Sequence, residues 1–165
     1  MGTSKKLSYL LRHSDLPDEQ GWLPLEKLIL DYGYTEQSIK QIVANDEKHR
    51  YEFSEDGKKV RAIYGHSNHV RIIYDPLVPP PILYHGTSQK DVDTIMKEGL
   101  KKMNRNFVHL SSTVEAAIQV GKRHGIPIVI KVDSSRMSED GVIFYSFSSR
   151  EIWLTEDINP QYLNV

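Results

Sequence analysis

The sequence predicts an α+β protein of two lobes joined by a short proline-rich linker. Three observations predict this fold class. Residues 4–44 carry apolar side chains at helical spacing, residues 51–64 indicate two strands around an Asp-Gly turn, and residues 82–154 alternate short apolar runs with helical stretches. Three helices followed by a hairpin resemble a winged-helix lobe, which is the expectation for residues 1–76.

The predicted first lobe holds three helices and a hairpin. Leu7, Leu10 and Leu11 recur at the spacing of one helical face, and Gly33 is a typical helix terminator. Asp56-Gly57 is a strong signal for a hairpin turn. The expected helices are residues 4–13, 24–32 and 35–44, and the expected strands are residues 51–53 and 60–64.

The predicted second lobe, residues 82–165, begins after a stiff linker. Pro79, Pro80 and Pro81 lack backbone donors and favour an extended chain, so residues 77–81 are predicted to form a hinge. Ser112 and Glu115 have the spacing of a capping box at a helix start. The expected strands are residues 82–84, 107–110, 127–132 and 152–154, and the expected helices are residues 88–98 and 112–124, ending at Gly99 and Gly125.

The composition excludes several classes of protein. The 165 residues, 39% of them hydrophobic, suffice for one ordinary domain or two small ones. A chain without cysteine has no disulfide, no thiolate nucleophile and no cysteine-bound zinc. A net charge of −1 is unlike that of a non-specific nucleic-acid binder, so an anion site must come from the placement of a few arginines. Without an apolar run or a secretory signal, we expect no membrane association and a cytoplasmic location, or a nuclear one in a eukaryote.

Arginine and histidine are neighbours at three places, Arg12-His13, His49-Arg50 and Arg123-His124. A guanidinium group binds phosphate oxygens through two parallel hydrogen bonds, and an imidazole with its usual pKa of about 6.5 suits proton transfer. If the fold brings these pairs together, they form a site that handles phosphate. The alternative is that each pair lies on a solvated helix face, as charged neighbours usually do.

Two short motifs of the second half place polar groups beside predicted strands. In Tyr84-His85-Gly86-Thr87 the glycine would let a ligand approach the backbone, and Thr87 and Ser88 would offer hydroxyl and N–H groups to an anion. His109 lies between apolar residues of a predicted strand. Each motif alone is also compatible with an ordinary glycine turn or a buried, hydrogen-bonded histidine.

The order and spacing of the motifs are informative when they are taken together. They are SKKLSYLLRH at 4–13, KHRY at 48–51, RAIYGHS at 61–67, LYHGT at 83–87, FVHLS at 107–111, VGKRHG at 120–125, IWLT at 152–155 and PQYL at 160–163. In order and spacing this set resembles the NAD-dependent tRNA 2′-phosphotransferases, and the resemblance covers the chain from residue 4 to residue 163.

The resemblance implies a winged-helix lobe that binds RNA and an ADP-ribosyltransferase-like lobe that binds NAD. It implies a catalytic set and a set that contacts the RNA or its phosphate, and it implies no metal ion and no obligatory protein partner. The catalytic set is Arg12, His13, Arg50 and Arg123, and the phosphate or RNA contacts are Lys48, His66 and Ser67. The NAD site is Tyr84, His85, Gly86, Thr87, His109, Leu110, Ser111, Gly121 and Ile152.

The implied reaction removes an internal RNA 2′-phosphate, as at a tRNA splice junction, and consumes NAD. The 2′-phosphate attacks the nicotinamide ribose and releases nicotinamide, which gives a 2′-phospho-ADP-ribosylated RNA. The ribose 2″-hydroxyl then attacks phosphorus, which leaves RNA with a 2′-OH and ADP-ribose 1″,2″-cyclic phosphate. His13 is the expected proton-transfer group of this second step, and the arginines would stabilise the growing negative charge.

Two other classes of function remain open. An ADP-ribosyltransferase that modifies nucleic-acid phosphate ends or protein would use the same NAD pocket and stop after the first transfer. A winged-helix binding module without enzymatic activity would explain the first lobe but give the HGT, VHLS and GKRHG motifs no role. One stretch also departs from the family pattern: where relatives often carry an Asn-Gly-Val-Trp-Leu-like sequence, this chain has Ser149-Arg150-Glu151-Ile152-Trp153-Leu154.

Overall fold

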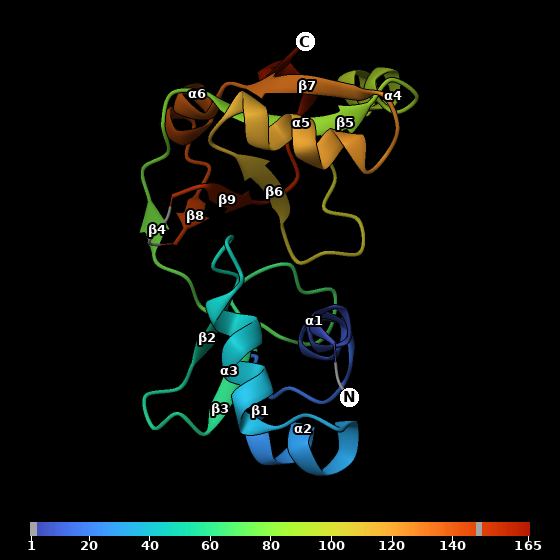
Figure 1. The fold of residues 1–165 in the computed structure, drawn as a ribbon. Helices are drawn as coiled ribbons and strands as arrows, with labels where there is room; N and C mark the ends of the chain where they lie inside the picture. Colours follow the sequence, from blue (N-terminus) through green and yellow to red (C-terminus); the bar gives the residue numbers. More distant parts are fainter. Residues whose placement is uncertain (1–2, 148–149) are drawn as a thin grey trace. The chain divides into compact units, whose positions relative to one another are not determined.

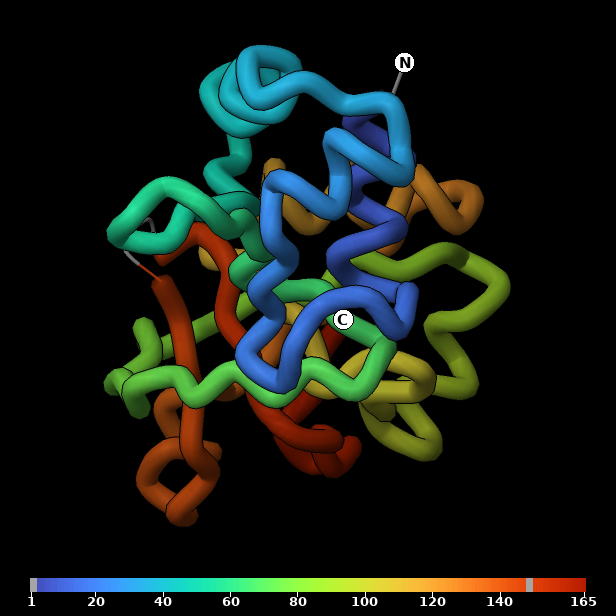
Figure 2. Tube along the Cα trace, turned by 90° about the horizontal axis from the view of Figure 1, so that it is seen from below, coloured from blue at the N-terminus to red at the C-terminus, as the bar shows by residue number. Residues whose placement is uncertain are grey.

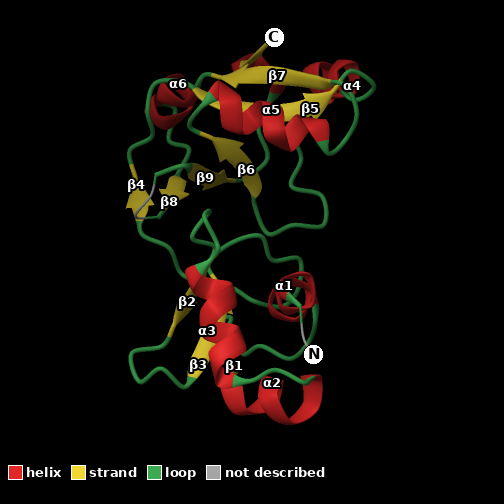
Figure 3. Cartoon of the chain, viewed as in Figure 1, coloured by secondary structure: helices red, strands yellow, loops and turns green. Residues whose placement is uncertain are grey.

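The computed structural model of the protein describes residues 3–147 and 150–165. Within them lie six α-helices and ten β-strands, and the strands form two antiparallel sheets (Figure 3). The chain divides into two compact units. The first contains the described residues up to Ile73 together with Asn104–Asn106, and the second contains Tyr74–Met103 and the described residues from Phe107 onward. None of the described helices is long and apolar enough to cross a bilayer.

The first unit packs three helices against a small three-stranded sheet, and its trace can be followed from blue to green in Figure 2. Its strands lie in the order β1-β3-β2. Its core contains fully buried Leu7 and Leu11 of the first helix, together with Leu28 and Ile39 of the next two. The elements are α1 (Ser4–His13), β1 (Leu23–Pro24), α2 (Leu25–Tyr32), α3 (Glu36–Ala44), β2 (Tyr51–Phe53) and β3 (Lys59–Ala62).

The helices of the first unit follow their local signals closely. The bounds predicted for α1 are confirmed, because Thr3 accepts a hydrogen bond from the backbone of Lys6 and caps the helix. Helix α2 begins one residue later than predicted, since Pro24 belongs to β1 and pairs with Lys59. It ends at Gly33 with φ 75°, as the glycine predicts.

The second unit is a seven-stranded antiparallel sheet with helices beside it. Its strand order is β10-β7-β5-β6-β9-β8-β4, and helix α5 lies over β5 and β7 (Figures 1 and 3). The helices are α4 (Val92–Glu98), α5 (Val114–Lys122), α6 (Ser134–Glu139) and the 3₁₀ turn η1 (Pro160–Tyr162). The strands are β4 (Pro76–Leu77), β5 (Leu83–Ser88), β6 (Val108–Ser111), β7 (Pro127–Val132), β8 (Phe144–Ser146), β9 (Ile152–Thr155) and β10 (Leu163–Asn164).

Several predicted bounds in the second unit are wrong, and hydrogen bonding explains two of them. Ser88 pairs with Pro127 and extends β5, so α4 begins at Val92 and not at Ser88. Ser112 donates its backbone N–H to Glu151, so Thr113 caps α5 in place of the predicted Ser112 box. Helix α5 ends at Lys122, two residues before the predicted end.

The predicted hinge over residues 77–81 lies inside the second unit. Leu77 pairs with Phe144 between β4 and β8, and the carbonyl of Pro80 accepts a hydrogen bond of 2.6 Å from the Ser134 hydroxyl. The division between the units falls instead between Ile73 and Tyr74. Three prolines make this segment extended, but its carbonyls and Leu77 still bind to neighbouring elements.

Glycines let helix α5 approach strand β5 at backbone distance. A Cβ atom at Gly86 would lie 1.8 Å from the carbonyl oxygen of Ala117 and 2.8 Å from the backbone nitrogen of Gly121. A Cβ atom at Gly121 would lie 2.6 Å from the carbonyl oxygen of Thr87. The space beside Gly86 is therefore filled by the helix, which is a different reason for this glycine from the ligand approach predicted by the motif.

Candidate functional site

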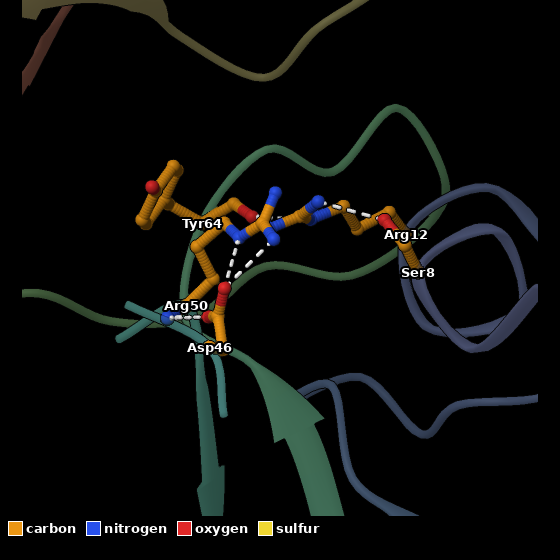
Figure 4. A network of polar contacts seen from close by, with 5 residues as sticks. All are labelled: Ser8, Arg12, Asp46, Arg50 and Tyr64. Atoms are coloured by element: carbon orange, nitrogen blue, oxygen red, sulfur yellow. Dashed lines mark hydrogen bonds and ion pairs between the residues drawn. The ribbon is translucent and has the colours of Figure 1, made fainter. Parts of the chain in front are cut away.

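Helix α1 positions Arg12 in its last turn with the guanidinium group buried. The side chain donates from Nε to the carbonyl of Tyr64 at 2.9 Å and from Nη1 to the hydroxyl of Ser8 at 2.8 Å (Figure 4). Gly65 has a φ of +93°, and a Cβ atom there would lie 3.1 Å from Arg12 Nε. The glycine therefore permits both the turn and the place of the guanidinium group.

Arg12 carries a buried charge that forms no ion pair within the described residues, although this charge helps to lower the pKa of Asp46. Its residue is 9% exposed, and its Nη2 is buried without a hydrogen-bond partner in the described part of the chain. Burial is the main cause that lowers the pKa of Arg12 from its ordinary value, and the positive charge of Arg50 lowers it further. A buried donor and an uncompensated charge are both costly, so this group is suited to an anionic ligand.

Arg50 approaches the same region from the start of β2, and an acid holds it in place. Its Nη2 and Nε donate to Asp46 Oδ1 at 2.7 and 3.0 Å, and its backbone N–H donates to Oδ2 at 2.6 Å (Figure 4). The hydrogen bond with Asp46 raises the pKa of Arg50. Burial acts to raise the pKa of Asp46, but the hydrogen bonds from Arg50 outweigh it and lower that pKa.

The ring of Tyr51 lies near both guanidinium groups. The Cζ atoms of Arg12 and Arg50 are 5.6 and 5.7 Å from the centroid of its ring. Figure 4 shows the two arginine side chains reaching toward one another from opposite sides. The fold thus brings together two arginines that are 38 positions apart in sequence, and Arg50 remains one-third exposed at its side chain.

Two histidines stand next to Arg12 and are neutral at neutral pH. His13 Nδ1 is 2.6 Å from the hydroxyl of Ser67, and burial with the charges of Arg12 and Arg105 lowers the pKa of His13. His66 is 4% exposed, and burial lowers its pKa to about 4. Its Nε2 has no hydrogen-bond partner among the described residues. The structure therefore places the predicted residues Arg12, His13, Arg50, His66 and Ser67 in the same unit.

A further arginine of the first unit, Arg105, was missed by the sequence analysis. Arg105 lies in the segment Asn104–Asn106, which belongs to the first unit although the residues around it belong to the second. Asn106 anchors the segment by donating its backbone N–H to the carbonyl of His66 at 3.1 Å and its side chain to the carbonyl of Val70 at 2.8 Å. The charge of Arg105 helps to lower the pKa of both Arg12 and His13, after the larger effect of burial. Its one local signal is its place two residues before Phe107, where the FVHLS motif begins.

Apart from Gly121, which lies in helix α5, the predicted NAD residues lie on adjacent strands of the second unit. Tyr84 of β5 pairs with Ser111 of β6, and Ser111 pairs with Ile152 of β9, so the three residues form a row across the sheet. His85 Nδ1 lies 3.4 Å from the carbonyl of His109, and burial lowers the pKa of His85. Thr87, Leu110 and Ser111 are buried. This group offers neutral imidazole and hydroxyl groups, which suit the hydroxyls of a ribose.

The remaining predicted residues with charged side chains, Arg123 and Lys48, are exposed. Arg123 follows α5 in the second unit and is exposed, and the structure does not place it in one unit with Arg12 and Arg50. Lys48 lies in the loop before β2 and is exposed. Ser149 lies outside the described residues, whereas Arg150 has φ 56° and its carbonyl accepts a 3.1 Å hydrogen bond from Trp153 Nε1. No group of three or more metal-binding side chains is present in residues 3–147 and 150–165.

Fold and site together define an α+β protein of two units, the first of which carries a cationic site suited to a phosphate group. The chain matches the family described as RNA 2'-phosphotransferase, Tpt1 / KptA family, over residues 1–157, and it belongs to that family.

Bacterial relatives match almost the whole chain. A protein of Acaryochloris marina is 40% identical over 169 residues, which is 96% of this chain and 93% of the relative. A protein of Agrobacterium fabrum is 39% identical over 173 residues, 99% of this chain and 92% of the relative. A protein of Streptomyces coelicolor is 39% identical over 170 residues, with 97% and 92% covered. Each of the three is named probable RNA 2'-phosphotransferase.

Proposed function

We propose that this protein is an NAD-dependent RNA 2′-phosphotransferase that removes an internal 2′-phosphate from a tRNA-like RNA. The observation that carries the proposal is the buried guanidinium group of Arg12, whose Nη2 is without a partner in the described chain, in a member of this family. A phosphate that accepts hydrogen bonds from Arg12 and Arg50 would satisfy the free donor and balance the buried charge.

The substrate phosphate would be held by Arg12, Arg50 and Arg105, with His66 and Ser67 beside them. Asp46 fixes the direction of the Arg50 side chain, whereas Arg12 is fixed by the neutral groups of Ser8 and Tyr64. The cluster therefore keeps a net positive charge that a dianionic phosphate can neutralise. Lys48 and Arg123, which the resemblance assigns to this chemistry, remain predictions.

His13 is proposed as the group that moves a proton. Its lowered pKa keeps the imidazole neutral near pH 7, which is the form that accepts a proton from a hydroxyl. The hydroxyl of Ser67 at 2.6 Å from Nδ1 would fix the ring, so that Nε2 faces the reacting groups. In the first step the 2′-phosphate is already an anion and needs positioning more than a base.

The second unit is proposed to bind NAD through β5, β6 and β9. The carbonyl of His109 can accept a hydrogen bond only from a protonated Nδ1 of His85, which leaves His85 Nε2 as an acceptor for a ribose hydroxyl. Ser111 and Thr87 add hydroxyl groups on adjacent strands. When bound, NAD would supply the ribose carbon that receives the phosphate and the hydroxyl that later attacks phosphorus.

The fold of each unit supports a proposal for the type of lobe that it forms. In the first unit the order α1-β1-α2-α3-β2-β3, with β1 paired to β3, supports the proposal of a winged-helix lobe that binds RNA. In the second unit the HGT motif on β5 beside VHLS on β6 supports an ADP-ribosyltransferase-like lobe. Both assignments are part of the same proposal.

The test is the identity of the products made from end-labelled RNA with one internal 2′-phosphate. With NAD we expect RNA with a plain 2′-OH, nicotinamide and ADP-ribose 1″,2″-cyclic phosphate in equal amounts, resolved on a gel and by mass spectrometry. Dephosphorylation without NAD would overturn the proposed dependence. An ADP-ribosylated RNA that accumulates as the final product would instead support an ADP-ribosyltransferase.

A further inference from the structure

A cavity next to Arg50 is not used by the reaction described above. It has a volume of about 400 Å³ and lies within the first unit, between the start of α1 and helix α3. Its size falls within the range of sites that take small organic molecules, about 300–1,000 Å³. The lining residues are Ser4, Ser38, Gln41, Ile42, Asn45, Asp46, Arg50 and Tyr51.

Two side-chain amides line this cavity without any partner. Gln41 on α3 and Asn45, the residue that caps the end of this helix, are one helical turn apart and exposed at the mouth of the cavity, and neither side chain makes a hydrogen bond within the described residues. Ser38, which precedes them on the same face, is occupied because its hydroxyl donates to the carbonyl of Thr35 and accepts from the Thr35 backbone N–H. The cavity therefore offers two unoccupied amide groups, each with donors and an acceptor.

The lining favours a base over a second phosphate. Ile42 and the ring of Tyr51 provide apolar surface, and Tyr51 is 7% exposed. Asp46 and Arg50, the two charged residues of the lining, form an ion pair at 2.7 Å, so the cavity has no unpaired positive charge to attract a further anion. Amide side chains pair with the edges of nucleobases, while apolar and aromatic groups contact their faces.

We propose that this cavity binds a nucleobase of the RNA substrate, next to the 2′-phosphate held by Arg50. Arg50 borders both places, since it lines the cavity and its guanidinium group, like that of Arg12, lies near the ring of Tyr51. Gln41 and Asn45 bind the polar edge of the base, and Ile42 and Tyr51 contact its apolar surface. This proposal rests on the proposed function and adds a base-binding site to it.

The test is a double-mutant cycle on RNA binding. The probe is a fluorescently labelled single-stranded hexaribonucleotide with one internal 2′-phosphate, and three versions lack the base at the phosphorylated nucleotide, the one before it or the one after it. For one abasic position we expect the wild type to bind about 10-fold more weakly, the effect of one good amide–base pair. The Gln41→Ala/Asn45→Ala variant should lose the same factor on intact RNA and nothing more on that abasic RNA.

The matched control is Gln37→Ala, an exposed glutamine of α3 that does not line the cavity. It should bind every RNA as the wild type does. Additive losses from the variant and each abasic position, or no loss in the variant, would overturn the base site. Anisotropy measures binding without turnover, so these results are distinct from a failure of the proposed function, which would show as intact 2′-phosphate in the presence of NAD.

Discussion

At the scale of single residues, Arg12 and Arg50 hold equal charges in different ways. Arg50 is paired with Asp46, which offsets the cost of partial burial. Arg12 is more deeply buried and makes hydrogen bonds only to neutral oxygen atoms. An unbalanced buried charge lowers stability in the absence of ligand and strengthens the binding of an anion, as expected where binding takes priority over stability.

Substitutions can decide whether Arg105 or Arg123 contributes more to the reaction. Arg105→Ala should slow single-turnover dephosphorylation about 10²–10³-fold, the cost of losing one charge-stabilising contact. Arg123→Ala should cost less, because Arg105 and not Arg123 is among the charges that lower the pKa of His13. NMR titration adds a second measurement: the pKa of His13 should rise in Arg105→Ala, since Arg105 lowers it, and should not change in Arg123→Ala. The reverse ranking would return the catalytic role to Arg123.

The sequence predicted part of this site for physical reasons. Arg12 and His13 are adjacent on an amphipathic helix, so a local pattern locates them, whereas His66 and Ser67 were predicted only through the resemblance of the RAIYGHS motif. Arg105 has no such pattern. Its place depends on Asn106 hydrogen-bonding to His66 and Val70, which are about 40 positions away in sequence, and no local periodicity reports such contacts.

At the scale of elements, the contact between α5 and β5 depends on Gly86. Gly86→Ala would place a methyl group against the Ala117 carbonyl and should destabilise the protein by about 3 kcal/mol, measured by denaturant unfolding. Gly141→Ala is the control in the same unit, because its φ is +96° and nothing lies within 4 Å of the added Cβ; it should cost about 1 kcal/mol. Equal, small losses in both variants, with weaker NAD binding in Gly86→Ala alone, would favour the ligand-approach role.

Length explains which elements the sequence predicted and which it missed. Helices α1 and α3 and strand β7 extend over enough residues to show their period. Strands β1 and β4 have two residues each and α6 has six, so none shows a full pattern. The errors at Ser88 and Ser112 have another cause, since strand pairing at Ser88 and a backbone hydrogen bond at Ser112 override the local signal for a helix start.

At the scale of the whole molecule, each unit has its own hydrophobic core. One core surrounds Leu7, Leu11 and Ile39, and the other surrounds Leu83, Ile130 and Trp153. The arginine cluster belongs to the first unit and the row across β5, β6 and β9 to the second. Because the two groups of side chains rest on separate cores, the binding of RNA phosphate and of NAD should respond to different substitutions.

This separation gives a prediction for binding by the full chain. Arg12→Ala and Arg50→Ala should each weaken binding of 2′-phosphorylated RNA about 10–100-fold, as expected for a charged hydrogen bond, while NAD affinity stays unchanged. His85→Ala should weaken NAD binding and leave RNA affinity unchanged, because its imidazole belongs to the sheet of the second unit.

Calorimetry with NAD and anisotropy with RNA measure the two affinities separately. RNA carrying a 2′-OH is the reference, since it should bind wild type and both arginine variants equally. A loss of NAD affinity in Arg12→Ala as large as its loss of RNA affinity would show that the two binding functions are not divided between the units.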